Sequence, residues 1–400
     1  MKILISGGWG YSNLGDDAIL ISTIKSIYKI NPSAENTVLS FNVEETYLNI
    51  HELFPNIPII KSLHATLFTK VNYPTNTNFI YNLRYKILKK ISSKYNTKLA
   101  SKILQKEERI LNEIIQKDKA YDNIFKSTDL YLMSGGGYLN DWIDMGCSKL
   151  LEVLHAKKYN KPVILLGQTV GPFHNNLCKN TTKRIISLAD KKFFRDYESI
   201  KEFDEISSIS FIPDIALSDI YRFNKKNYIT IIPFNKEILL NLDLICLNLK
   251  QLSIDSGCEI IITVSQEWPW TIKYAQIIEK KLRKIKVQAT FINPQTVLEL
   301  QQILGKSKLV ISQNLHGLII GYRSITPVIS LNGRRKFQAF MKMINAQECI
   351  ILPKNINNQY CFTKLYRKAS QQINYIESFQ AEIHKIFHEI FKPYGCKNKR

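Results

Sequence analysis

Long hydrophobic runs, patterned cysteines and acidic residues are all scarce in this chain of 400 residues. No apolar run approaches the roughly 18 residues that a membrane-spanning helix needs. Only the apolar run 3–5 precedes Gly7, which is too short for the core of a signal peptide. The seven cysteines are odd in number and lack Cys-x-x-Cys spacing, which favours free thiols in a reducing cytosol over a disulfide or zinc framework. We therefore expect a cytoplasmic protein that is neither secreted nor integral to a membrane.

The shortage of acidic residues leaves a strong positive charge. The chain has 55 Lys+Arg against 34 Asp+Glu, a net charge of +21. Such a charge attracts polyanions, anionic lipid surfaces or phosphorylated substrates. Nucleic-acid binding would rest on the charge alone, because no RNP-like or zinc-finger pattern is present. We therefore expect no nucleic-acid partner.

Short apolar runs alternate with longer amphipathic segments along the chain, which is the pattern of an α/β protein. Most of the runs are continuously apolar, as expected for parallel strands that are covered on both faces. The predicted strands form two series, 2–6, 37–42, 129–133, 162–167 and 192–195, then 228–234, 259–264, 286–292, 308–312, 327–331 and 349–352.

These two series predict two Rossmann-like α/β domains that face each other across a cleft. The expected boundaries are an N-terminal domain over 1–208, a linker over 209–227 and a C-terminal domain over 228–353. Helices over 354–400 are expected to pack over the domains.

A helical insertion is predicted at about 80–127, and its segment 84–106 holds eight basic residues and no acidic one. Apolar residues recur at roughly helical spacing among the basic ones. A basic amphipathic helix can lie on an anionic membrane surface. It can equally be a solvated helix whose apolar stripe packs on the core, and the sequence leaves both interpretations open.

Glycine-rich turns follow three of the predicted strands in the first domain. Glycine lets the backbone approach a ligand closely at the carboxyl ends of parallel strands, where open α/β sheets bind their substrates. The dinucleotide fingerprint G-x-G-x-x-G is absent because Asn13 stands where its third glycine would be, so a nicotinamide cofactor is disfavoured. The candidate acceptor-binding or anion-binding positions in these turns are Gly8, Gly10, Asn13, Gly15, Gly135, Gly136, Gly137 and Gln168.

Charged and titratable residues follow other strands. Arg195 ends a strand at the same edge, where it can grip an anion while Asp196 orients it. His316 stands where a strand passes into a helix, an address typical of anion binding and catalysis. Three cations, residues 334–336, follow the next strand.

Other chemistry lacks support in the sequence. There is no Walker loop and no G-x-S-x-G elbow, which disfavours P-loop and acyl-hydrolase functions. His384 and His388 are spaced as a metal pair on a helix but have no evident third ligand, so we expect no metal.

Taken in order, six segments resemble the motifs of the polysaccharide pyruvyl transferase family. They are 10–16, 134–141, 167–172, 195–199, 315–319 and Lys336. The resemblance spans about residues 1–345. Asn314 departs from it, since some members carry Arg at this position, and one anion contact would then come from elsewhere.

The resemblance implies a pair of glycosyltransferase-B-like domains and a ketal-forming transferase. Family members move the pyruvyl group of phosphoenolpyruvate onto two hydroxyls of one sugar and release phosphate. The acceptor is typically a cell-surface glycan or its lipid-linked precursor, which suits an enzyme at the inner face of the cell membrane. Phosphoenolpyruvate would be a co-substrate, with no cofactor.

The resemblance also implies roles for individual residues. His316 is the expected acid/base, because imidazole exchanges protons near neutral pH. Asp16 or Asp141 would orient or deprotonate the acceptor. The phosphate and carboxylate of the donor call for cations and helix N-termini, and the donor-binding candidates are Arg195, Asn314, Leu315, His316, Arg334, Arg335 and Lys336.

Two other functions fit the same two-domain fold, because a fold does not decide a function. The main alternative is a nucleotide-sugar glycosyltransferase acting in surface-glycan synthesis. The other is a non-catalytic glycan-binding protein that has kept the loops.

Overall fold

The computed structural model describes residues 1–68, 119–141, 143–371 and 375–394. Their contacts divide the chain into two compact units: unit 1 is Met1–Tyr11, Thr23–Ile215 and Ile386–Arg400, and unit 2 is Ser12–Ser22 and Ala216–Lys385. The basic segment 84–106 lies outside the described residues, so its membrane role stays a prediction. No described helix combines the length and the apolar character needed to cross a bilayer.

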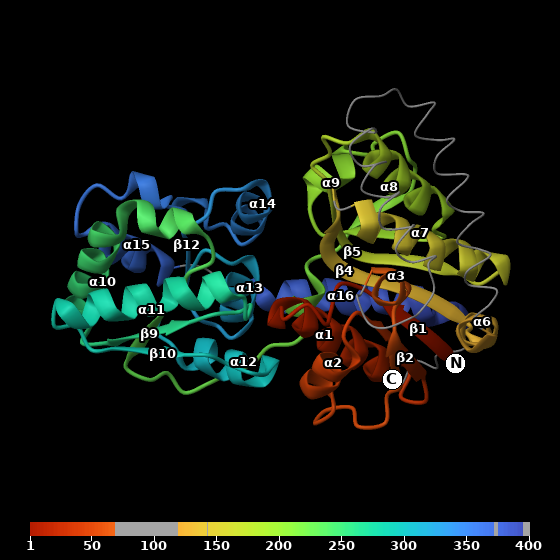
Figure 1. Cartoon of the computed structure of the whole chain (residues 1–400), viewed down its shortest axis with the longest axis horizontal. Coiled ribbons are helices and arrows are strands. Elements are labelled where there is room, and N and C mark those ends of the chain that lie inside the picture. Colours follow the sequence, from red (N-terminus) through yellow and green to blue (C-terminus); the bar gives the residue numbers. More distant parts are fainter. Residues whose placement is uncertain (69–118, 142, 372–374, 395–400) are drawn as a thin grey trace. The chain divides into compact units, whose positions relative to one another are not determined.

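Unit 1 is built on a seven-stranded parallel sheet in the order β3-β2-β1-β4-β5-β6-β7 (Figure 1). Its strands are β1 (Lys2–Ser6), β2 (Glu35–Ser40), β3 (Ile59–Lys61), β4 (Leu130–Leu139), β5 (Val163–Val170), β6 (Lys191–Phe194) and β7 (Ile209–Phe211). The described helices around it are α1 (Leu14–Ile30), α2 (Val43–Ile50), α3 (Leu63–Phe68), α6 (Lys119–Ser127), α7 (Ile143–Lys158), α8 (Asn176–Leu188) and α9 (Tyr197–Lys201).

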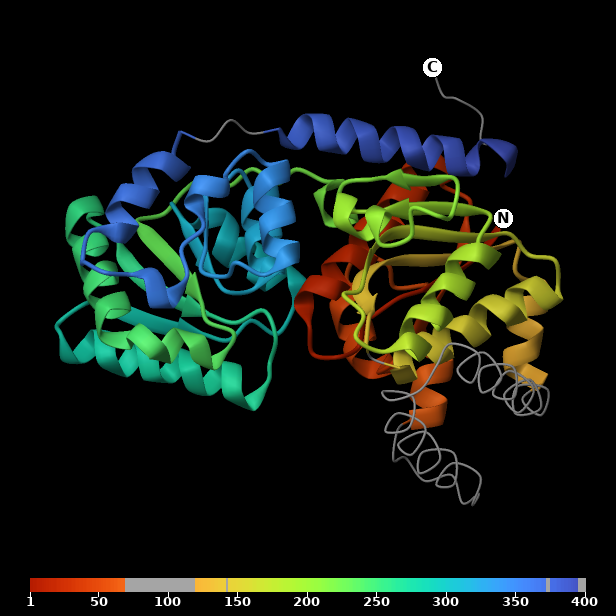
Figure 2. The ribbon, with the colours of Figure 1, turned by 90° about the horizontal axis from the view of Figure 1, so that it is seen from above.

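Unit 2 repeats the plan on a five-stranded parallel sheet in the order β10-β9-β8-β11-β12. Figure 2 shows the strands of this unit with helices on either side. Its strands are β8 (Tyr228–Ile232), β9 (Glu259–Thr263), β10 (Ala289–Ile292), β11 (Val310–Ser312) and β12 (Val328–Ser330). Its described helices are α10 (Leu242–Ser256), α11 (Pro269–Lys284), α12 (Val297–Lys306), α13 (Leu315–Arg323), α14 (Arg335–Met343) and α15 (Cys361–Ala369). The helix α16 (Ile376–Phe391) begins in unit 2 and ends in unit 1.

The apolar character of the strands explains the two layers of helices around each sheet. Ile3, Leu4 and Ile5 of the central strand β1 are all buried, because one face of the sheet is covered by α1 and α2 and the other by α7 and α8 (Figure 1). Right-handed crossovers on the two sides of β1 place these helices on opposite faces. The α/β class with two parallel sheets is therefore confirmed.

The glycines of β4 and β5 lie inside strands rather than in turns after them. The predicted strands 129–133 and 162–167 continue to Leu139 and Val170. Gly136 and Gly167 have φ values of 140° and 71°, which side chains rarely allow, and the pairing of β4 with β5 shifts register after Gly136. The pairing of β4 with β5 resumes at Leu139 because glycine can adopt the backbone conformation that this irregularity requires.

Two boundaries differ from the prediction. The segment 209–227 is not a simple linker: Ile209–Phe211 is β7, which pairs with β6, and unit 1 extends to Ile215. The predicted strand 349–352 is absent, and Ile350 forms only an isolated bridge with Ser330. Residues 209–211 and 349–352 are both short, largely apolar stretches, and so short a stretch does not distinguish an edge strand from a loop.

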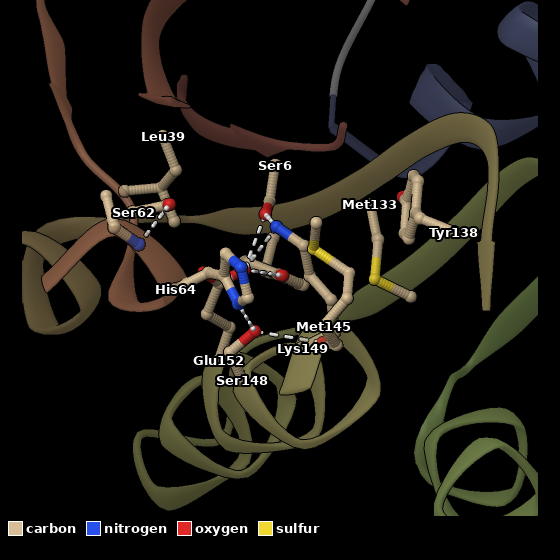
Figure 3. Close-up of polar contacts among 12 residues, drawn as sticks. Ser6, Leu39, Ser62, His64, Met133, Tyr138, Met145, Ser148, Lys149 and Glu152 are labelled. Carbon is tan, nitrogen blue, oxygen red and sulfur yellow. Dashed lines mark hydrogen bonds and ion pairs between the residues drawn. The ribbon is translucent and has the colours of Figure 1, made fainter. Parts of the chain in front are cut away.

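A buried ion pair lies beneath the end of β1 (Figure 3). Lys149 and Glu152 of α7 are 1% and 0% exposed, with Nζ 3.1 Å from Oε2. The Ser6 hydroxyl accepts from Lys149 Nζ at 2.6 Å and donates to Glu152 Oε2 at 2.5 Å. Tyr131 OH also donates to this oxygen, at 2.8 Å, and burial raises the pKa of Tyr131 well above its ordinary value. These contacts fix Ser6, the last residue of β1, next to the glycine turn.

The free energy of unfolding should depend strongly on the ion pair between Lys149 and Glu152. Replacing Glu152 with Leu leaves the Lys149 charge buried without its counter-ion, so the free energy of unfolding should fall by about 3–5 kcal/mol. The double change Lys149→Met with Glu152→Leu should recover most of this loss. Urea denaturation of both variants checks the expectation. A double variant as unstable as Glu152→Leu alone would contradict it.

Candidate active site

His316 occupies the first turn of α13, at the carboxyl end of β11 in unit 2. Asn314 is the N-cap of this helix: its Oδ1 accepts from the backbone N–H groups of His316 at 2.9 Å and Gly317 at 3.2 Å. The cap satisfies donors that a helix start leaves unpaired and fixes the direction of the first turn. The histidine is 8% exposed, so the helix start holds the imidazole in a nearly buried position.

Asp16, in the first turn of α1, faces His316. Its Oδ1 lies 3.8 Å from His316 Nε2, and its Oδ2 accepts from Asn13 Nδ2 at 2.5 Å. Gly15 permits this approach, because a Cβ at that position would lie 2.0 Å from Cγ of the imidazole. Residues 300 positions apart in the chain therefore bring a carboxylate and an imidazole together within unit 2.

The turn that carries Asp16 is held by the loop after β9. Asn13 and Gln266 form an antiparallel bridge, flanked by hydrogen bonds from Leu14 N to Ser265 O at 3.0 Å and from Glu267 N to Ser12 O at 3.1 Å. This short strand-like contact explains why residues 12–22 group with unit 2 although they precede most of unit 1 in the chain.

Buried side-chain amides tie together the loops at the carboxyl edge of the unit 2 sheet. Gln313 Oε1 accepts from Phe234 N at 2.9 Å and from Asn235 N at 3.2 Å, which joins the loops after β11 and β8. Asn332 Nδ2 donates to Gln313 O at 3.2 Å, and Asn314 Nδ2 donates to Gln266 Oε1 at 3.4 Å. These hydrogen bonds join the four loops that follow β8, β9, β11 and β12 around His316.

Three cations follow β12, which pairs with β11. Arg334 is the N-cap of α14, and Arg335 and Lys336 begin that helix. Arg334 is largely exposed, and its Nη2 lies 4.0 Å from Glu237 Oε1. Because α13 and α14 start at adjoining strand ends, their positive dipole ends and these cations favour a small anion at this edge. Leu315, another donor-binding candidate, is buried at the start of α13.

Unit 1 brings its own predicted residues together. A Cβ on Gly137 would lie 3.7 Å from Arg195 Nη2, so the glycine strand of β4 passes beside the guanidinium. A Cβ on Gly8 would lie 3.0 Å from the Tyr138 ring, and one on Gly10, where φ is 78°, 2.5 Å from Asn42 N. Gly8, Gly10 and Gly135–137 therefore share the carboxyl edge of this sheet with Arg195.

Arg195 is a buried residue whose acidic partner is not the expected one. Its Nη1 pairs with Asp214 and its Nε donates to Thr169 Oγ1 at 2.7 Å. Asp196, the predicted partner, accepts from the Thr169 hydroxyl at 2.8 Å and caps α9 by accepting from Ser199 N at 2.7 Å. Asp196 therefore orients Arg195 only through Thr169, because a residue adjacent along an extended strand points to the opposite face.

Gln168 and Asp141 have contacts that anchor the backbone. Gln168 Nε2 donates to Met133 O at 2.9 Å and to Tyr138 OH at 3.1 Å, which joins β4 to β5. The Asp141 carboxylate accepts from the backbone N–H groups of His174, at 3.0 Å to the nearer oxygen, and Asn175, at 3.2 Å. Asp141 belongs to unit 1, whereas Asp16 lies beside His316 in unit 2.

The order of these motifs is that of a known family, whose model, polysaccharide pyruvyl transferase, matches residues 13–334. The chain belongs to the polysaccharide pyruvyl transferase family. The matched residues include Asp16, Arg195 and His316, so both edges described above lie within the family's core. Family membership makes the chain a transferase of polysaccharide synthesis.

Several solved structures share the fold at low identity. The UDP-GlcNAc 2-epimerase of Neisseria meningitidis, bound to UDP-GlcNAc, has a TM-score of 0.58 at 14% identity, covering 98% of this chain and 100% of that one. The Methanocaldococcus jannaschii UDP-GlcNAc 2-epimerase has a TM-score of 0.59 at 12% identity, with coverage of 99% and 100%. The S. aureus MnaA in its co-structure with UDP has a TM-score of 0.57 at 12% identity, with coverage of 100% and 98%. No curated protein sequence matches the chain. These similarities show a glycosyltransferase-B-like fold.

Sequence reasoning missed several residues that position the site in this family member. Asp214 stands after Pro213 in the polar stretch assigned to the linker, and nothing in the pattern connects it to Arg195. Gln313 lies just before the segment 315–319, but its side-chain amide binds the loop after β8, which is far away in the sequence. Gln266 and Asn332 follow predicted strands, and this position after a strand is the one sequence signal that indicates a role at the site.

The contact between Gly15 and His316 predicts an energetic coupling. Gly15→Ala should lower the free energy of unfolding by about 1–3 kcal/mol, because the new methyl group collides with the imidazole. In a His316→Ala background, Gly15→Ala should change the free energy of unfolding very little, because the imidazole is no longer there to collide with. Chemical denaturation of the four proteins gives the coupling energy.

Gly146→Ala is the matched control, because a Cβ there meets only Thr181 Cγ2 at 3.7 Å. An equal cost of Gly15→Ala with and without His316 would show that the imidazole does not occupy the described place.

Proposed function

We propose that this chain transfers the pyruvyl group of phosphoenolpyruvate onto two hydroxyls of one sugar, forming a cyclic ketal and releasing phosphate. The observation that carries the proposal is an acid/base pair, His316 and Asp16, beside two helix N-termini and three cations at one sheet edge. A donor with a phosphate, a carboxylate and a carbon to be protonated requires this combination.

The anionic groups of the donor fit the described edge. The N-termini of α13 and α14 and the side chains of Arg334, Arg335 and Lys336 supply positive charge from adjoining strand ends. Asn314 has its Oδ1 committed to the α13 cap, so it positions the backbone rather than replacing an arginine. Arg195, held by Asp214 and Thr169, belongs to unit 1, and its donor-binding role stays a prediction from the sequence.

The chemistry divides into two additions at C2 of the donor. One sugar hydroxyl attacks C2 and gives its proton to a base, while C3 of the methylene group takes a proton from an acid, which makes the methyl group of the product. The C2–O bond to phosphate then breaks, the second hydroxyl attacks C2, and its proton leaves with the phosphate or through a base. His316 is the proposed acid toward C3, and Asp16 is the proposed base or orienting group.

Family membership supports the proposed acceptor and setting. Polysaccharide synthesis calls for a sugar acceptor, either a cell-surface glycan unit or its lipid-linked precursor. Phosphoenolpyruvate is a cytosolic metabolite, so the proposed reaction belongs on the cytoplasmic side, where a lipid-linked acceptor would lie at the membrane surface. The proposed steps include no redox change and use no cofactor.

One alternative has an observation in its favour. Two of the similar structures contain UDP or UDP-GlcNAc, which fits a nucleotide-sugar glycosyltransferase on the same scaffold. Such an enzyme would release a nucleotide and would not consume phosphoenolpyruvate.

The first test is a phosphate-release assay with phosphoenolpyruvate and a panel of surface saccharides. If His316 is the general acid, His316→Ala should lower turnover by about 10²–10⁴-fold. His316→Gln donates a hydrogen bond but cannot shuttle protons, so it should be nearly as inactive. A glutamine variant with turnover close to that of the wild type would make His316 a binding residue.

Two carboxylates provide the matched control. Asp16→Asn should lower turnover by about 10²-fold or more, as expected for loss of a base. Asp141→Asn should leave turnover nearly unchanged and reduce stability, because Asp141 accepts two backbone N–H groups. The reverse ranking would move the base to Asp141.

A further inference from the structure

Three aromatic side chains gather at the carboxyl edge of the unit 2 sheet. The rings of Phe234 and Trp268 lie 5.7 Å apart, and those of Trp268 and Trp270 lie 4.8 Å apart at 51°. Phe234 and Trp268 are half-buried, and Trp270 is 47% exposed. A tryptophan with half of its surface in water buries little apolar area for the fold, so this aromatic surface needs another explanation.

The amide network that fixes His316 also fixes this surface. Gln313 Oε1 binds Phe234 N, and Gln266, two residues before Trp268, binds the Asn314 side chain. Trp268 is held in turn as the N-cap residue of α11, where its backbone N–H donates to Thr271 Oγ1 at 3.2 Å. The rings are therefore a fixed part of the same sheet edge as the acid/base pair.

Glu267, Asn235 and Asn293 place a carboxylate and two amides in the loops at this sheet edge. Glu267 precedes Trp268 and accepts from Asn293 Nδ2 at 2.7 Å. Asn293 Oδ1 and Asn235 Nδ2 are buried atoms without a hydrogen-bond partner among the described residues. Carboxylate and amide groups beside aromatic rings suit a ligand rich in hydroxyls.

We infer that Phe234, Trp268 and Trp270 form a platform for a pyranose ring of the acceptor saccharide. The C–H groups on one face of a pyranose carry partial positive charge and stack on the negative faces of aromatic rings, while its hydroxyls reach Glu267 and the amides. The inference rests on the proposed function in calling this saccharide the acceptor. The platform itself requires only saccharide binding.

The test is binding of the full chain to an array of bacterial surface polysaccharides and their hexose and N-acetylhexosamine oligosaccharides. Trp268→Ala and Trp270→Ala should each weaken binding by about 2- to 10-fold, and Trp270→Phe should restore most of it. Leu240→Ala is the matched control, because Leu240 is a 68% exposed apolar residue of the same unit. In the phosphate-release assay the tryptophan variants should raise the KM for the saccharide and leave that for phosphoenolpyruvate unchanged.

The outcomes separate this inference from the proposed function. No saccharide binding by the wild type, or equal binding by the alanine variants, would overturn the platform even if pyruvyl transfer is observed. UDP competing for the tryptophan-dependent binding would also overturn it in favour of a base-stacking site. Tryptophan-dependent saccharide binding without consumption of phosphoenolpyruvate would keep the platform and reject the proposed reaction.

Discussion

Buried side-chain amides hold the functional edge of unit 2 together. Parallel strands deliver all their carboxyl ends to one edge, and the loops that leave them carry backbone groups that must be satisfied away from water. Gln313, Asn314, Gln266 and Asn332 satisfy or join these loops. Because each amide binds a loop other than its own or caps a helix, a single network places His316, Asp16 and the aromatic surface.

In unit 1, buried ion pairs help to join the strand ends at the carboxyl edge of the sheet. Arg195 joins β6 to Asp214 beyond β7 and to Thr169 of β5, and the Lys149–Glu152 pair supports the end of β1. Buried ion pairs cost desolvation energy, which additional hydrogen bonds help to offset. Thr169 accepts from Arg195 Nε, and the Ser6 hydroxyl bonds both Lys149 Nζ and Glu152 Oε2. The glycine strands can therefore approach Arg195 closely on a rigid frame.

The sequence was sufficient for the strands with continuous apolar runs and for the place of His316 at a strand-to-helix junction. The spacing of apolar residues and the presence of turn residues are local signals, and both are clear in the sequences of β1, β8 and α13. The partnership of Asp16 with His316 was beyond reach, because it depends on Gly15 and on a bridge between Asn13 and Gln266 that no local pattern encodes. Asp196 was chosen as the partner of Arg195 by adjacency, whereas the tertiary fold supplies Asp214.

Recognition of phosphoenolpyruvate by the cations after β12 can be measured by calorimetric titration. The purified chain would be titrated separately with phosphoenolpyruvate and with UDP-GlcNAc, in the wild type and in a variant with Arg334→Ala and Arg335→Ala. Phosphoenolpyruvate should bind saturably, and the double variant should weaken this binding by about 1.5–3 kcal/mol or more, the range of hydrogen bonds to charged groups. Saturable binding of UDP-GlcNAc with no heat from phosphoenolpyruvate would contradict it.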